Sequence, residues 1–150
     1  MDRRGISPVI ATVIIVAVTI AVSIAVAYWM GGLASFFTRF EKIEIGSAYA
    51  NGTEATGFTI KLTSIKNTGS ADATISQVLI NGRLHSEYGS TTVNGSATLT
   101  PISIVAGGSK SSIIIQTPAG YGAPFTSGTT LTITLHTASG KDYPINVALP

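Results

Sequence analysis

The chain has 150 residues and no cysteine, and charged residues make up 11% of it, against roughly 25% in an ordinary soluble domain. Nine basic and seven acidic residues give a net charge of +2, which is too small to indicate nucleic-acid binding. Without cysteine, the chain forms no disulfide framework, no thiolate metal site and no cysteine nucleophile. The length allows one domain of ordinary size together with an additional segment.

The first long element in the chain is an uncharged apolar tract. Residues 6–38 contain no Asp, Glu, Lys, Arg or His, and a membrane span needs about 20 apolar residues. The many Val, Ile and Thr residues favour a strand in water, but an isolated strand cannot satisfy its backbone in lipid, whereas a helix can. We therefore predict a hydrophobic transmembrane helix in the segment 6–42, with Pro8 in its first turn.

The remainder of the chain, residues 43–150, has a different composition, with 13 Gly, 13 Ser and 17 Thr among its 108 residues. Alternating apolar runs predict strands over 57–62, 74–80, 97–104, 111–116, 130–135 and 143–147. Turns are expected at Asn81-Gly82, Gly107-Gly108 and Ser139-Gly140, and loops at 51–57 and 119–128. The expected fold class is α+β: a long N-terminal hydrophobic helix followed by an all-β, immunoglobulin-like sandwich of about seven or eight strands.

The N-terminus differs from an ordinary signal peptide, in which an apolar stretch of about 7–15 residues is followed by a small-residue cleavage site. Here the apolar tract is much longer, so we expect the mature protein to keep it. Arg3 and Arg4 lie on the short side of the tract. Because basic residues favour the cytoplasmic side, residues 43–150 are expected to form an extracellular domain.

The sequence RRGISPVIATVIIVAVTIAVSIAVA resembles the N-terminus of archaeal type IV pilins. The resemblance implies a class III leader peptide over residues 1–5, which a membrane aspartic peptidase, the prepilin peptidase, cuts between Gly5 and Ile6. Such a cut removes the charged residues and leaves an apolar helix that can move from the bilayer into a filament core. In bacterial type IV pilins the fifth residue after the cut is glutamate, whereas Ile10 stands there in this chain, as suits archaeal filaments.

The length of the tract also fits a filament. Thirty-three helical residues span about 50 Å, against a hydrocarbon core of about 30 Å, and helices packed in a bundle can use the additional length. Ala17, Ala21 and Ala25 recur every four residues and would let helix backbones approach closely. Three hydroxyl side chains can hydrogen-bond backward to their own helix, namely Thr12, Thr19 and Ser23.

A band of aromatic residues lies near the end of the tract, and two interpretations of it stay open. The band can form a belt at the membrane interface, or it can pack against the base of the β domain. Its members are Tyr28, Trp29, Phe36, Phe37 and Phe40.

Asn51 and Asn94 each begin an Asn-x-Ser/Thr triplet and are candidate N-glycosylation sites in turn-like surroundings. The expected external location favours their modification. Asn-Gly, which occurs in both triplets, is also a favoured turn in itself.

The residue types of a catalytic triad occur in the chain, but their spacing does not indicate one. His85 and His136 could combine with Asp72, Asp142 and a serine, yet there is no Gly-x-Ser-x-Gly elbow. We expect ordinary surface or strand-end histidines and no enzymatic activity. No cluster of His, Asp or Glu indicates a metal site, and the GGSK run at 107–110 lacks the rest of a phosphate-binding loop. No cofactor is expected.

By resemblance, the chain is a structural subunit of an archaeal adhesive type IV pilus, a homo-oligomeric helical filament on the cell surface. Its precursor lies in the cell membrane, and its assembly partners are a cytoplasmic secretion-type ATPase and a multi-span platform membrane protein. One alternative is a membrane-anchored, monomeric extracellular β-sandwich that binds a ligand. Another is an archaellin of the swimming filament, although the Ser-Pro-Val-Ile start favours the pilin branch.

Overall fold

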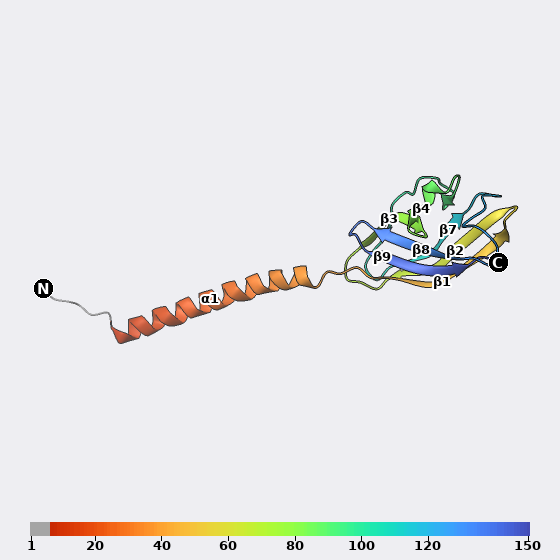
Figure 1. Cartoon of the computed structure of the whole chain (residues 1–150). Coiled ribbons are helices and arrows are strands. Elements are labelled where there is room, and N and C mark those ends of the chain that lie inside the picture. The colour runs from red at the N-terminus through yellow and green to blue at the C-terminus, as the bar shows by residue number, and fades with distance from the viewer. Residues whose placement is uncertain (1–6) are drawn as a thin grey trace. The chain divides into compact units, whose positions relative to one another are not determined.

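The computed structural model describes residues 7–150, and Figure 1 labels their helix and strands. The chain divides into two compact units, Met1–Arg39 and Phe40–Pro150. The β domain was expected to begin at residue 43. The boundary lies slightly earlier, because residues 40–42 hydrogen-bond to residues 68–71 of the second unit.

Among its described residues, the first unit contains one helix, α1, which spans Pro8–Phe37. Pro8 occupies the first turn, where its missing N–H is not needed. The helix ends at Thr38, whose N–H donates to the carbonyl of Ala34 at 3.2 Å. The predicted hydrophobic helix is thus confirmed, and it continues without interruption through both glycines of its last third.

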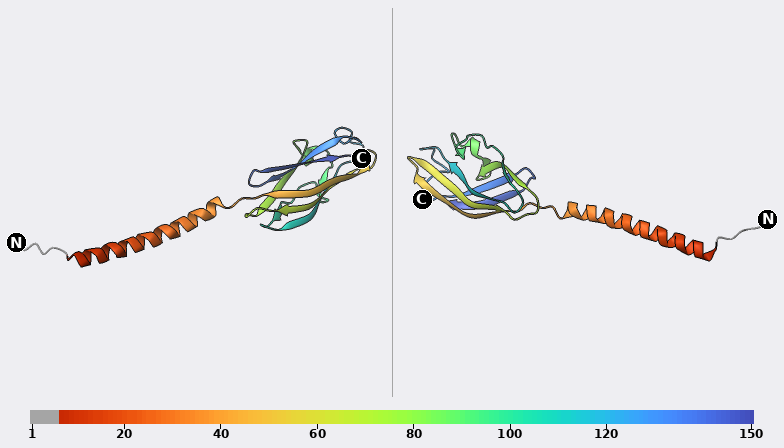
Figure 2. Two further views of the ribbon diagram at one scale, coloured as in Figure 1. Left: turned by 90° about the horizontal axis from the view of Figure 1, so that it is seen from below. Right: turned by 180° about the vertical axis from the view of Figure 1, so that it is seen from behind.

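The second unit is a sandwich of two antiparallel sheets, whose two layers are visible in Figure 2. One sheet has the strand order β1-β2-β7-β5, and the other has the order β4-β3-β8-β9, with β6 also paired to β3. The α+β fold class is therefore confirmed. The first sheet consists of β1 (Ile43–Thr53), β2 (Gly57–Asn67), β5 (Thr92–Val93) and β7 (Ser109–Gln116). The second consists of β3 (Ala73–Ile80), β4 (Arg83–Leu84), β6 (Ile102–Ile104), β8 (Thr130–Thr137) and β9 (Asp142–Ala148).

The core lies between the sheets, because alternate residues of each strand point inward. In β2, Phe58, Ile60 and Leu62 are buried, whereas Thr59 between them is exposed. Each fully buried Ile or Leu side chain contributes about 1.5–3 kcal/mol relative to an exposed one. The same alternation occurs in β8, whose inward residues are Leu131, Ile133 and Leu135.

Two hairpins bring distant parts of the chain to the start of β1. The ladder between β1 and β2 begins at Ile43↔Asn67, so the connection after β2 lies beside the residues before β1. The ladder between β8 and β9 ends at His136↔Asp142, and the turn of this hairpin follows. Strand β1 also lies against β9, which closes one side of the sandwich.

Most of the predicted strands are confirmed, and three expectations need correction. The run 97–104 forms a strand only over Ile102–Ile104, directly after Pro101, which has no N–H for a ladder. The loop expected over 51–57 is shorter and covers only residues 54–56, because β1 extends to Thr53 and β2 begins at Gly57. Residues 7–150 contain nine strands rather than seven or eight, since β4 and β5 have two residues each.

The predicted turns are confirmed, and each contains a residue in the left-handed region. Asn81 and Gly82 have φ values of 50° and 80° and connect β3 to β4, as a two-residue hairpin turn requires. Gly107 and Gly140 have φ values of 73° and 83° in the turns before β7 and β9. The predicted loop over 119–128 is also confirmed.

Candidate functional site: the apolar helix and the entry to the sandwich

The side chains of α1 over Pro8–Ala34 are exposed, apart from that of Ala11, which is half-buried. The segment Pro8–Ala34 is long and apolar enough to cross a membrane, and none of it is buried in the described structure. Val13, Ile15 and Ile24, for example, expose 62%, 62% and 65% of their surface. An uncovered apolar surface of this size is unfavourable in water. The helix is therefore compatible with a membrane anchor or a signal sequence.

Three hydroxyl groups of α1 bond within the helix, as predicted. Thr12 Oγ1 donates to the carbonyl of Val9 at 2.8 Å, and Thr19 Oγ1 donates to that of Val16 at the same distance. Ser23 Oγ donates to the carbonyl of Thr19 at 2.7 Å. These three side chains need no hydrogen-bond partner from another molecule, so they do not oppose burial of this helix in an apolar environment.

The small-residue stripe of the sequence prediction, Ala17, Ala21 and Ala25, is exposed on α1. The predicted cleavage position, Gly5 and Ile6, lies outside the described residues. Among the aromatic residues, the members at the end of α1 expose large fractions of their rings, up to 87% for Tyr28. Phe40 belongs to the second unit.

Residues 40–42, here called the strap, precede β1 and are held by the connection between β2 and β3. The backbone amides of Ser70 and Ala71 both donate to the carbonyl of Phe40, at 2.8 and 2.9 Å. In return, the N–H of Phe40 donates to Ser70 Oγ at 3.1 Å. The carbonyl of Phe40 therefore has two donors within the sandwich.

The strap lies directly on Gly69. A Cβ atom at this position would lie 2.3 Å from the carbonyl oxygen of Phe40 and 2.7 Å from Cα of Glu41, so the close approach requires glycine. The N–H of Thr68 donates to the carbonyl of Lys42 at 2.8 Å. The β2–β3 connection thus contacts the strap along its whole length.

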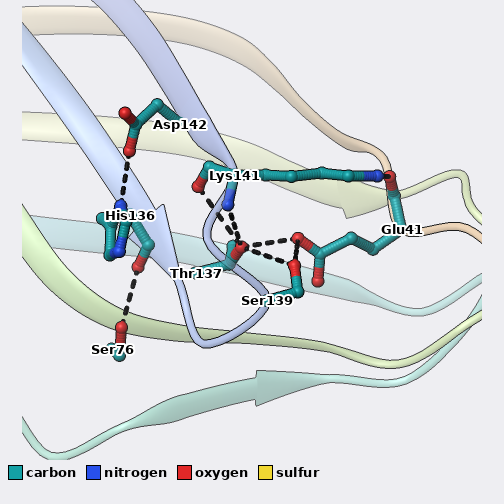
Figure 3. Close-up of polar contacts among 7 residues, drawn as sticks. All are labelled: Glu41, Ser76, His136, Thr137, Ser139, Lys141 and Asp142. Carbon is teal, nitrogen blue, oxygen red and sulfur yellow. Dashed lines mark hydrogen bonds and ion pairs between the residues drawn. The ribbon is translucent and has the colours of Figure 1, made fainter.

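Figure 3 shows the side of the strap that faces the β8–β9 hairpin. Glu41 is only 7% exposed, and its carboxylate accepts hydrogen bonds from Thr137 Oγ1 at 2.5 Å and from Ser139 Oγ. The backbone carbonyl of Glu41 accepts from Lys141 Nζ at 3.0 Å and from the Tyr143 hydroxyl at 3.2 Å. We call these four side chains the clasp. Thr137 and Ser139 supply donors to a carboxylate whose burial without donors would be unfavourable, whereas Lys141 and Tyr143 hold the backbone of the same residue.

One residue of the clasp, Tyr143, makes the stability of the sandwich decrease at alkaline pH. Burial raises the pKa of Tyr143 above its ordinary value of 10.0. Because the pKa is higher in the folded state, the associated stability is fully present below about pH 10 and is lost as the pH rises through the folded pKa. We expect the free energy of unfolding to fall above this pH more steeply in the wild type than in Tyr143→Phe. Chemical denaturation at a series of pH values measures both slopes, and equal slopes would contradict the assignment.

The two histidines occupy different environments. His85 follows β4 in a short 3-10 turn, η1 (His85–Glu87), and is 4% exposed. Its ring nitrogens lie 3.3 Å from the carbonyl of Val78 and 3.2 Å from that of Ala97. Of the two expected settings, surface or strand end, His85 has the second: it directly follows β4, and its ring is buried beside β3.

His136 lies on the outer side of β8, where Nδ1 is 2.6 Å from Asp142 Oδ1. Ser76 Oγ donates to the backbone carbonyl of His136 at 3.3 Å and not to its ring, as Figure 3 shows. Asp72 accepts from the N–H of Ala106 at 2.9 Å. The residues considered for a triad therefore do not assemble into one. Within residues 7–150, no group of three or more His, Cys, Asp or Glu side chains is placed to hold a metal ion.

Both candidate glycosylation residues are exposed; Asn51 lies in β1, and Asn94 lies in the turn after β5 and bonds to β7 of the same sheet. Asn51 lies within β1 opposite Thr59, so its surroundings are a strand and not the expected turn. Asn94 follows β5 with a φ of 52°, and its Oδ1 accepts from the N–H of Ile114 at 2.9 Å. Attachment of a sugar uses the nitrogen of the amide, which this hydrogen bond does not occupy.

Sequence reasoning did not identify the strap and the clasp. Glu41 belongs to no recognisable motif in the sequence, and its side-chain partners lie about a hundred positions later. Among its contacts, the clearest local signal is Gly69, which follows Asn67 and Thr68 after a predicted strand. A glycine there indicates a turn or a close backbone approach, but not the segment that approaches.

Comparison with known proteins found no family model that matches the chain and no curated protein that is similar to it.

Proposed function

We propose that the chain is a structural subunit of an archaeal type IV-like adhesive pilus, whose β-sandwich is carried on the cell surface by its apolar helix. The observation that carries the proposal is the uncharged, unburied apolar segment Pro8–Ala34. The resemblance of the N-terminal sequence to archaeal type IV pilins adds the type of assembly. In this proposal the precursor lies in the membrane, and the mature chain is extracellular.

The dimensions of α1 support packing among like helices. Thirty residues rise about 45 Å at about 1.5 Å per residue, which exceeds the roughly 30 Å of a hydrocarbon core. In a helical bundle the whole length is covered by neighbouring copies. The stripe of Ala17, Ala21 and Ala25 lets backbones approach there, and the internally bonded hydroxyls bring no unsatisfied group to the interface.

The proposed assembly uses a head-to-tail contact that is repeated by a screw operation. Such a contact does not close on itself and therefore produces an open filament. The helices would form the apolar interior, and the sandwiches would coat it with their exposed Ser and Thr side chains. The prepilin peptidase, an assembly ATPase and a platform membrane protein are the proposed partners, and all three follow from the resemblance.

The cleavage step provides the test. We expect the chain recovered from sheared surface filaments to begin at Ile6. Gly5→Leu is expected to block the cut, because a bulky residue replaces the small one before the scissile bond, and to leave uncut chain in the membrane without filaments. Asp2→Asn, a change within the leader but away from the cut, is the matched control and should assemble normally. Electron microscopy of sheared material and N-terminal sequencing measure both outcomes.

Other results would identify the alternatives. Filaments formed by Gly5→Leu would contradict the cleavage step, and single chains that are released only by detergent and keep Met1 would indicate a monomeric membrane anchor. An archaellin would also form filaments, but its loss would abolish swimming. Loss of the proposed pilin would abolish surface adhesion and leave swimming intact.

A further inference from the structure

We propose that the strap and the clasp form a latch that bears tension entering the sandwich at Phe40 and protects β1 from being peeled off β2. This inference rests on the proposed function in one respect: tension arises when α1 is held in a membrane or a filament while the sandwich adheres elsewhere. The latch itself is a property of residues 40–150. It can therefore be tested without filaments.

The position of the latch follows from the order of the chain. Strand β1 begins at Ile43, and its ladder with β2 begins at the pair Ile43↔Asn67. Without further contacts, a pull from the N-terminal side would open this ladder one pair at a time. The hydrogen bonds from Ser70 and Ala71 to Phe40 come before the ladder along the chain. A pull must break them first.

The latch also connects the two sheets. Strand β1 belongs to the β1-β2-β7-β5 sheet, whereas the clasp side chains lie on β8, on β9 and in the turn between them. Glu41 therefore joins the entry of the first sheet to the second sheet through both its carboxylate and its backbone carbonyl. Force on the strap is shared by both layers of the sandwich.

The chemistry of Glu41 favours two discrete states. With the clasp closed, the buried carboxylate accepts two hydroxyl hydrogen bonds. Hydrogen bonds to a charged acceptor are stronger than neutral ones, and a buried charge without donors is strongly unfavourable. The strap is therefore stable when Glu41 has both of its hydroxyl hydrogen bonds or when Glu41 has moved into water. A partly opened strap, in which the carboxylate is buried without donors, is disfavoured.

Native-state hydrogen exchange of the full chain in detergent micelles tests the latch. The reporters are the amides of Ser70 and Ala71, which donate to Phe40 and are released when the strap opens. In the double variant Thr137→Val/Ser139→Ala, Glu41 loses both hydroxyl donors, and we expect these amides to exchange at least roughly tenfold faster. The amides of β2 should keep their wild-type rates. Thr134→Val, a change on the outer side of β8 away from the clasp, is the matched control and should alter neither set.

A second variant approaches the strap from its other side. Gly69→Ala places a methyl group against Phe40 and Glu41 and should accelerate the same two reporters without any change in the clasp. Unchanged exchange of Ser70 and Ala71 in both variants would overturn the proposal. An equal acceleration of the β2 amides would also overturn it, because the strap would then open only with the whole sandwich. Neither result depends on whether the chain forms filaments, so a failure here is distinguishable from a failure of the proposed function.

Discussion

Val22→Asp is expected to weaken the residence of α1 in the membrane. Val22 lies near the middle of Pro8–Ala34, where the described structure offers no partner for a carboxylate. An Asp at the centre of a spanning helix costs about 2.5–3.5 kcal/mol on an insertion scale, which corresponds to roughly a hundredfold change in the insertion equilibrium. The same substitution would bury a charge in a filament interior. Fractionation of cells, followed by quantification of the chain in the membrane and in sheared surface material, measures the loss.

The matched control at this position is Val22→Ala. It shortens the side chain without adding charge and should leave both fractions at wild-type levels, because alanine already recurs along this helix. Normal recovery of Val22→Asp in the membrane or in filaments would contradict the assignment of α1 to an apolar environment. It would show instead that this surface is covered by water or by polar protein.

Ile133→Ala is expected to lower the free energy of unfolding of the sandwich by about 2–5 kcal/mol. Ile133 is fully buried in the middle of β8 and belongs to the core between the two sheets. Its truncation removes apolar burial and leaves a cavity that the two paired sheets cannot readily close. For a domain of about a hundred residues, each 1 kcal/mol lowers Tm by roughly 4–8 °C. Thermal unfolding followed by circular dichroism should therefore show a decrease of more than about 8 °C.

The adjacent residue supplies the control for this prediction. Thr134 is on the opposite, outward side of β8 and pairs with Pro144 of β9. Thr134→Ala should change stability by no more than about 0.5 kcal/mol, as is usual for surface substitutions. Equal effects of Ile133→Ala and Thr134→Ala would contradict the assignment of inward and outward faces in β8.

The sequence predicted well the elements whose signal is local. The helix followed from a long run without charge, and β8 from strict alternation over 130–135. Asn81-Gly82 predicted its turn because both residues tolerate positive φ. In each case neighbouring residues determine the backbone, so no knowledge of distant contacts was needed.

Strand β1 was not predicted, and its residues explain why. The sequence IEIGSAYANGT has few large apolar residues, and Gly46 interrupts the alternation. Ala48 and Ala50 are only half-buried against the core, as suits a strand at the edge of a sheet. Pairing with β2 determines this strand. A single-sequence pattern does not contain that information.

The residues of the candidate site also fall into two groups, those indicated by the local sequence and those that depend on distant contacts. The apolar helix and its bonded hydroxyls follow from local composition, whereas the strap depends on contacts between Glu41 and residues near 140. Those contacts exist because β8 and β9 form a hairpin and β1 packs beside it. Prediction of the clasp would have required the sheet order first. The cleavage residues, Gly5 and Ile6, remain a prediction from the sequence.

The positions of the two candidate glycosylation residues have a practical consequence, because both lie in or beside the β1-β2-β7-β5 sheet. Asn51 lies in β1, and Asn94 bonds to β7. A sugar at either position would shield this sheet from proteases and antibodies and leave the β4-β3-β8-β9 sheet bare. The outward threonines of β8 therefore form the better epitope. An antibody or a fluorescent label directed at Thr132 and Thr134 should reach the chain equally well in its sugar-free and sugar-bearing forms.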